Sequence, residues 1–150
     1  MNAEGLKKTW LAAAAASGGI TAAIVLYTVL VEVLAARGYR APLAQFGAGP
    51  FKYAFYALGA MALPAVKLAG RTAAAKLHTP EGTIRALAVS AIARAAAAEL
   101  PAIAGLLLFL LAGLRADFYM LAVFAVGLEL YHFPRLGAWE ERLRADFGQL

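Results

Sequence analysis

The stretch that decides the fold reads TWLAAAAASGGITAAIVLYTVLV, residues 9–31, which is 23 residues without a charged side chain. The hydrocarbon core of a bilayer is about 30 Å thick, and about 20 helical residues cross it. The stretch is therefore long enough to form a transmembrane helix. Lys7 and Lys8 precede it, as in a signal peptide, but a cleavable apolar core has only about 7–15 residues. We therefore expect an uncleaved first span.

The composition of the whole chain is typical of a membrane protein. Of its 150 residues, 63% are hydrophobic and 15% are charged, and the mean hydropathy is +0.70. Soluble domains are about 45–50% apolar and about 25% charged. This difference argues against a soluble enzyme, a disordered tail and a nucleic-acid-binding domain, although the net charge is +5. The length predicts one domain, residues 1–150, and the absence of cysteine excludes disulfides and thiolate sites.

Three further apolar stretches predict an all-α integral membrane protein with a bundle of four transmembrane helices. We place the four spans at about residues 9–35, 51–69, 95–114 and 118–133. The second span is short, and it depends on Lys52 and Lys67 reaching the headgroups along the apolar surface. The third span must tolerate Glu99, and Glu129 interrupts the fourth. The count falls to three if the segment around Glu129 lies on the membrane surface.

The two middle helices are predicted to be longer than the membrane is thick. The helical pattern continues from Phe51 to about Leu77, and Thr79-Pro80 is typical of an N-cap followed by proline in the first turn. Helices over 51–77 and 80–114 would be roughly 40 and 52 Å long. We therefore expect a long central helical hairpin that projects into the cytoplasm and contacts another molecule or segment there.

The C-terminal stretch LGAWEERLRADFGQL, residues 136–150, predicts an amphipathic helix. Leu136, Trp139, Leu143 and Phe147 recur every three or four residues, and charged residues cover the other face. We favour a helix that lies on the inner membrane surface. The alternative is that it docks against the projecting hairpin.

The distribution of lysine and arginine predicts the orientation. If both termini lie inside, the inner segments carry ten of these residues and the outer segments carry four. The positive-inside rule then favours a multi-pass protein of the inner (cytoplasmic) membrane with cytoplasmic N- and C-termini.

Two carboxylates within the predicted spans are the candidate site residues. Ionisable groups inside a membrane are costly and often functional. Glu99 and Glu129 are expected at similar depth in the inner half of the membrane, where proximity in a low dielectric favours a shared proton. One interpretation is a proton- or ion-binding site. The other is a salt-bridge network with Arg94, His132 and Arg135 that orients the third and fourth helices, and the residue types alone favour this network.

Small residues indicate helix packing. In the first span Gly18 is flanked by alanines four residues away, and the third span has Ala98, Ala102 and Gly105 at spacings of three and four. Such faces let helices approach closely in lipid, either within one chain or between copies.

Glu32 lies near the outer end of the first span. We expect its charge to be balanced by Arg37 or solvated at the outer surface.

The middle hairpin resembles the c subunit of rotary ATP synthases, the proteolipid that forms the membrane rotor ring. The resemblance covers about residues 51–114 and is carried by YALGAMALPAVKLAGRTAAAKL, the turn TPEG, and RALAVSAIARAAAAELPAIAGLLLFLLAG. It implies that Glu99 is the ion-carrying carboxylate, with Pro101 as its neighbouring proline. The family's tight glycine repeat is reduced here to Gly59 and Gly70, and the polar loop has His78-Thr79-Pro80 where the family has Arg, then Gln or Asn, then Pro.

These observations predict a non-enzymatic subunit or assembly partner of a larger inner-membrane complex. Its expected partners are lipid and either other membrane subunits or further copies of itself, with no nucleic acid, cofactor or metal. The alternative is a proton-translocating proteolipid or small transporter that uses Glu99, with or without Glu129. An enzyme is disfavoured because the sequence has no His-rich cluster, no Gly-x-Ser-x-Gly elbow and no phosphate loop.

Overall fold

A computed structural model of the chain describes residues 3–44, 49–72 and 79–148. These residues form helices and no strand, which confirms the predicted all-α class. The helices are α1 (Ala3–Ala36), α2 (Gly49–Ala60), α3 (Ala62–Thr72), α4 (Pro80–Ala112), α5 (Arg115–His132) and α6 (Leu136–Phe147). His78 and the predicted helical stretch after Thr72 lie outside the described residues.

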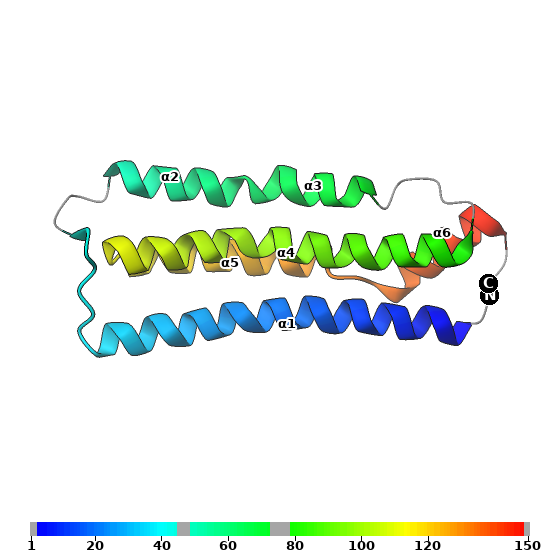
Figure 1. The fold of residues 1–150 in the computed structure, drawn as a ribbon, viewed down its shortest axis with the longest axis horizontal. Helices are drawn as coiled ribbons and strands as arrows, with labels where there is room; N and C mark the ends of the chain where they lie inside the picture. Colours follow the sequence, from blue (N-terminus) through cyan, green and yellow to red (C-terminus); the bar gives the residue numbers. More distant parts are fainter. Residues whose placement is uncertain (1–2, 45–48, 73–78, 149–150) are drawn as a thin grey trace.

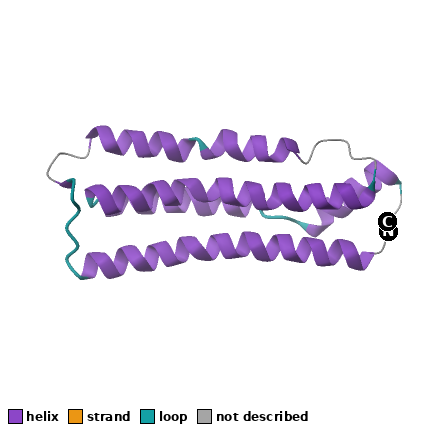
Figure 2. Cartoon of the chain, in the orientation of Figure 1, coloured by secondary structure: helices purple, strands orange, loops and turns teal. Residues whose placement is uncertain are grey.

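Helix α4 is the centre of the architecture. Figures 1 and 2 show α1 on one side of α4, α2 and α3 in line on the other, and α5 behind it. The start of α1 and the end of α6 lie at the same end of the structure. By length and composition, α1, the α2–α3 pair and α4 are able to cross a membrane, and α5 with α6 passes the same test as a pair bent by 43°. The structure is thus compatible with a multi-pass membrane protein of three or four spans.

The ends of α4 follow the predicted signals. The backbone N–H of Gly82 donates to Oγ1 of Thr79 at 3.2 Å, and Pro80 occupies the first turn. Gly113 ends the helix with φ of +76°, and its N–H donates to the carbonyl of Phe109 at 2.8 Å. Glycine adopts this left-handed conformation without steric cost. The hydrogen bond between Gly82 and Thr79 at the other end of the helix confirms the predicted N-cap.

The first arm of the predicted hairpin is interrupted at Met61. Pro64 has no N–H to donate to the carbonyl of Ala60, and a proline ring inside a helix also disturbs the preceding turn. The N–H of Met61 still bonds the preceding turn, and its carbonyl accepts from Ala65 at 3.1 Å. Consequently α2 and α3 stay in line and together form one arm beside α4 (Figure 2).

The first turns of α4, which belong to the predicted projecting hairpin, have α1 packed beside them. With 34 residues, α1 is as long as α4, about 50 Å, and its first turns lie beside the start of α4. Leu6 and Ala13 of α1 are buried in one cluster with Ile84 and Leu87 of α4. Helix α1 begins six residues before the apolar stretch, at Ala3. In this first part Glu4 and Lys8, one turn apart, form an ion pair of 3.0 Å.

Helix α6 docks on the bundle, which corrects the favoured interpretation of a helix on the membrane surface. Trp139 is 4% exposed and Leu143 is fully buried, and both belong to the cluster formed by the first turns of α1 and α4. Pro134 lies in the break between α5 and α6, and its carbonyl accepts a hydrogen bond from the indole N–H of Trp10 at 3.1 Å. This break lets α6 turn its apolar face toward protein.

Candidate functional site

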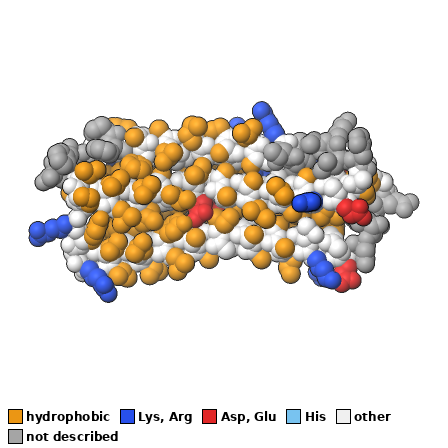
Figure 3. Space-filling view, viewed as in Figure 1, with side chains coloured by type: hydrophobic (Ala, Val, Ile, Leu, Met, Phe, Trp, Pro, Cys, Tyr) orange, Lys and Arg blue, Asp and Glu red, His pale blue; other side chains and the backbone are white. Residues whose placement is uncertain are grey.

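The described surface is largely apolar, with isolated charges. Figure 3 shows hydrophobic side chains over most of one face and a single acidic side chain near its middle. Large hydrophobic side chains are exposed on several helices, including Leu26 of α1, Tyr53 of α2 and Val123 of α5. Monomeric soluble proteins rarely expose contiguous apolar patches of more than a few hundred Å². The extent of this apolar surface is typical of a protein that contacts lipid. Within it, polar side chains on the apolar helices are candidate functional groups.

Glu99 lies on α4 and is partly exposed. The hydroxyl of Tyr27, on α1, donates a hydrogen bond of 2.6 Å to its Oε1. Ala96 and Ile92, one and two turns earlier on α4, are exposed, so Glu99 lies along the edge of an exposed stripe of this helix. Glu99 is about 20 Å from the end of α4 at Ala112.

Glu129 lies on α5 and is only 2% exposed. Its Oε2 is 3.1 Å from the hydroxyl of Thr21, which is also 3.2 Å from the carbonyl of Ser17 and has one proton to donate. The other carboxylate oxygen, Oε1, is buried without a hydrogen-bond partner, as is the hydroxyl of Ser17. Buried polar atoms without a partner are rare in native proteins, so each calls for an explanation.

The two carboxylates form one site on three helices, which we call the central carboxylates. Glu129 is about 20 Å from Arg115 at the start of α5, so it lies at nearly the same level as Glu99. The two carboxyl groups are close enough for their charges to interact. Helix α1 contributes a hydroxyl to each of them. The arrangement is two acids, held by neutral donors, at one level of the bundle.

Among the described residues, the structure does not form the salt-bridge network that the residue types favoured for Glu99 and Glu129. Within the described part of the chain, neither central carboxylate is ion-paired with Arg94, His132 or Arg135. Arg94 instead donates to the carbonyl and the hydroxyl of Ser90, at 3.2 and 3.1 Å. The three basic residues line a separate cavity of about 430 Å³ at the break between α5 and α6, which we call the Arg94 cavity.

Sequence reasoning missed the contribution of α1. Ser17, Thr21 and Tyr27 are among the few polar residues of a largely apolar span, and that contrast is the signal that points to them. Which helix their hydroxyls meet depends on the rotation of α1 about its axis, which the apolar pattern of this span does not define.

The predicted packing residues fall into two groups. Ala98 and Ala102 are fully buried, and a Cβ added to Gly105 would lie 3.1 Å from the Cα of Phe118 on α5. Glycine is needed there because α4 and α5 approach closely. Gly18, by contrast, is exposed, and a Cβ added there would meet no atom within 4 Å.

Ion pairs at the end opposite α6 hold helices together. Glu32 of α1 accepts hydrogen bonds from the guanidinium of Arg115 and the hydroxyl of Tyr119, both on α5. Arg115, rather than Arg37 or the surface, is therefore its partner. Lys52 of α2 lies 2.6 Å from the carboxylate of Asp117, again on α5. These pairs are structural connections between helices.

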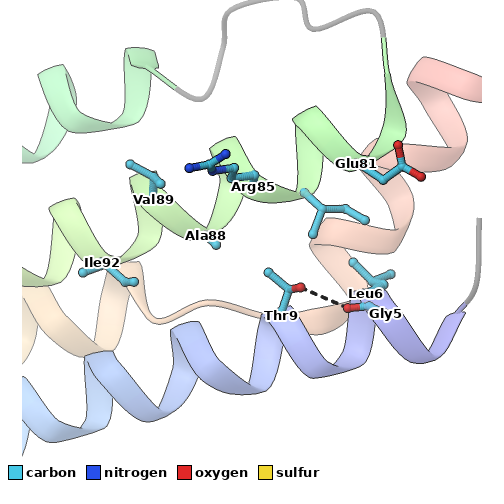
Figure 4. A pocket seen from close by; sticks show the side chains of 9 residues that line it. Gly5, Leu6, Thr9, Glu81, Arg85, Ala88, Val89 and Ile92 are labelled. Carbon is cyan, nitrogen blue, oxygen red and sulfur yellow. Dashed lines mark hydrogen bonds between the residues drawn. The ribbon is translucent and has the colours of Figure 1, made fainter.

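A groove of about 550 Å³ runs between the first turns of α1 and α4. Figure 4 shows that its labelled side chains come from both helices and that the Thr9 hydroxyl bonds the carbonyl of Gly5. Its floor is apolar, and Glu81 and Arg85 supply the charges. Among the described residues, no group of three or more His, Asp and Glu side chains is placed to hold a metal ion.

No protein-family model, curated protein or solved structure matches this chain. The resemblance to the rotary c subunit therefore stays a prediction.

Proposed function

We propose that this chain is a non-enzymatic integral protein of the inner membrane, with both termini in the cytoplasm, and that it serves as a subunit or assembly partner of a larger membrane complex. In this proposal α1, α2–α3, α4 and α5 cross the bilayer. The exposed apolar side chains on these helices and the excess of basic residues at the end that carries the termini support it.

The observation that carries the proposal is the position of Glu99. It lies about 20 Å from the outer end of α4, which in a core about 30 Å thick is within the inner half of the hydrocarbon. A carboxylate facing lipid at such a depth costs about 2.5–3.5 kcal/mol on insertion scales for the helix centre. The Tyr27 hydroxyl meets one of its oxygens, at Oε1. A helix of another subunit that covers this stripe and donates a hydrogen bond to the carboxylate would remove the remaining cost.

A second surface supports assembly independently. Ala15, Gly18 and Ala22 are exposed on α1 at spacings of three and four residues. Faces of small residues permit close approach of a second helix in the membrane. This surface is open for contact with another subunit or with a second copy of the chain.

Photo-crosslinking from the exposed stripe of α4 tests the proposal. A photoreactive amino acid at Ala96, one turn from Glu99, should produce discrete protein adducts in native membranes. The matched control is Val123 on α5, which is 71% exposed and is expected to face lipid. Adducts at Ala96 and none at Val123 would support the proposal. Only lipid adducts at both positions would contradict it.

Proton translocation is the second candidate, and the state of Glu129 favours it. A buried carboxylate with one oxygen unpartnered is a group that readily holds a proton, and Glu99, at the same level, would be the group that exchanges this proton with it. Glu99→Gln should then abolish proton flux in proteoliposomes and labelling by a carbodiimide while assembly is retained. Glu81→Gln, at the start of α4, is the control. Loss of assembly without any effect on flux would favour the subunit role instead.

A further inference from the structure

The Arg94 cavity lies where α5 ends and α6 begins. Its walls come from α4, from the connection around Pro134 and from the first turns of α6. Trp139 and Ala138 contribute apolar surface, and the polar lining consists of four basic side chains and one phenol: Arg94, His132, Arg135, Arg142 and Tyr131. No carboxylate is among the described residues that line it.

The basic side chains in this cavity come from three helices and the connection before α6. Arg94 of α4 is close enough to Arg142 of α6 and to His132 of α5 for their charges to interact. Like charges repel, so an anion bound beside these side chains would lower the electrostatic cost of the arrangement. The described partners of Arg94 are the carbonyl and hydroxyl of Ser90, which are neutral. Arg142 has a carboxylate partner on its own helix, Asp146, at 3.7 Å.

The start of α6 adds backbone donors to the same place. The first N–H groups of a helix have no intrahelical partner and carry partial positive charge. Arg135 is the N-cap of α6, and no side chain caps this helix end by a hydrogen bond. Pro134, Arg135 and Ala138 all line the cavity, so the helix start borders it. Exposed helix N-termini are common binding sites for phosphate.

We propose that the Arg94 cavity binds a phosphate group, supplied either by the headgroup of an anionic phospholipid or by free phosphate. Arginine is suited to this because its planar guanidinium donates two parallel hydrogen bonds to a phosphate. The lipid source rests on the proposed membrane orientation. His132 is about 26 Å from the outer end of α5, which places the cavity near the inner headgroups. The phosphate chemistry does not depend on that orientation.

A tryptophan in the cavity wall makes ligand binding measurable. The chain has two tryptophans, and Trp139 lines the cavity while Trp10 bonds the adjacent carbonyl of Pro134. Ligand binding can therefore be followed by tryptophan fluorescence of the full chain, purified in a mild detergent and stripped of lipid. The probes are inorganic phosphate, dihexanoyl phosphatidylglycerol and, as a zwitterionic comparison, dihexanoyl phosphatidylcholine.

We expect a saturable fluorescence change with phosphatidylglycerol that weakens at high salt. Arg94→Gln should raise the apparent Kd about tenfold or more, because it removes charge-assisted hydrogen bonds. Arg94→Lys should recover part of the affinity. The matched control is Arg144→Gln on α6, which removes the same charge from an exposed position outside the cavity and should change the Kd less than about twofold.

The outcomes separate the two sources of phosphate. Saturation by phosphatidylglycerol alone identifies a headgroup site, and equal saturation by inorganic phosphate identifies a site for free phosphate. No saturable response to either probe would overturn the proposal, and so would equal affinity in the Arg94→Gln and Arg144→Gln proteins. If circular dichroism shows that Arg94→Gln does not fold, Arg135→Gln replaces it with the same expectation. The crosslinking test at Ala96 does not involve this cavity, so the two proposals fail separately.

Discussion

The hydroxyl of Tyr27 donates a 2.6 Å hydrogen bond to Glu99, and this bond joins α1 to α4 within largely apolar stretches of both helices. A phenol is a neutral donor, so it holds the carboxylate in place without introducing a balancing charge. The second acid, Glu129, is held in the same way by Thr21. The central carboxylates are therefore fixed in position by α1 and are not neutralised by any described base.

Removal of the Tyr27 hydroxyl should loosen this site. Tyr27→Phe keeps the ring and removes the donor, so we expect a loss of about 1 kcal/mol in the free energy of unfolding, as is typical of hydrogen bonds between membrane helices. Labelling of Glu99 by a carbodiimide should become faster. The measurements are unfolding in mixed micelles and mass spectrometry of the labelled site. Tyr131→Phe is the control, since that side chain is 78% exposed, and an equal loss in both variants would contradict the role of the bond.

The contact between α4 and α5 should be sensitive to one methyl group. Gly105→Ala places a Cβ 3.1 Å from the Cα of Phe118 and 3.2 Å from its carbonyl oxygen, where backbone must move. Overpacking of this kind costs about 1–3 kcal/mol. Unfolding of the variant in mixed micelles measures the cost, and an unchanged stability would show that the two helices do not approach this closely.

Gly18→Ala is the matched change at an open position. No atom lies within 4 Å of the added Cβ, and alanine is favoured over glycine in a helix interior by up to about 1 kcal/mol. We expect the free energy of unfolding of the isolated chain to stay equal or to rise. If a partner packs on this face, the same substitution should reduce co-purification of that partner. A destabilised isolated chain would show instead that Gly18 packs within the bundle.

Docking of α6 should contribute directly to bundle stability. Leu143 is fully buried, and Leu143→Ala should lower the free energy of unfolding by about 2–5 kcal/mol. Arg144→Ala, at the exposed neighbouring position, should change it by less than about 0.5 kcal/mol. Limited proteolysis should also cut α6 sooner in the Leu143→Ala protein. A helix that lies on the membrane surface would show neither difference.

The elements predicted well from the sequence are those governed by local chemistry. The all-α class follows from long apolar stretches, and the start of α4 follows from Thr79 and Pro80. The interruption at Met61 was not predicted, although Pro64 is present in the sequence and has no N–H to continue the helical hydrogen bonds there.

The elements predicted poorly depend on which surfaces meet. The apolar face of α6 was correctly recognised, but lipid and protein are equally good environments for Trp139 and Leu143, and the sequence does not distinguish them. In the same way, acids and bases on neighbouring helices suggested salt bridges. The partners of Glu99 and Glu129 are instead hydroxyls on a helix far away in sequence.

The native mass of the untagged protein, extracted from its own membranes in a mild detergent, tests the proposed function most directly. The chain alone has a mass of 15.7 kDa. We predict a defined assembly whose mass requires other polypeptides or further copies of this chain, and which is lost or reduced when Glu99 is replaced by Gln. A monomer that carries only lipid and detergent, in the wild-type protein and in the variant alike, would contradict the account.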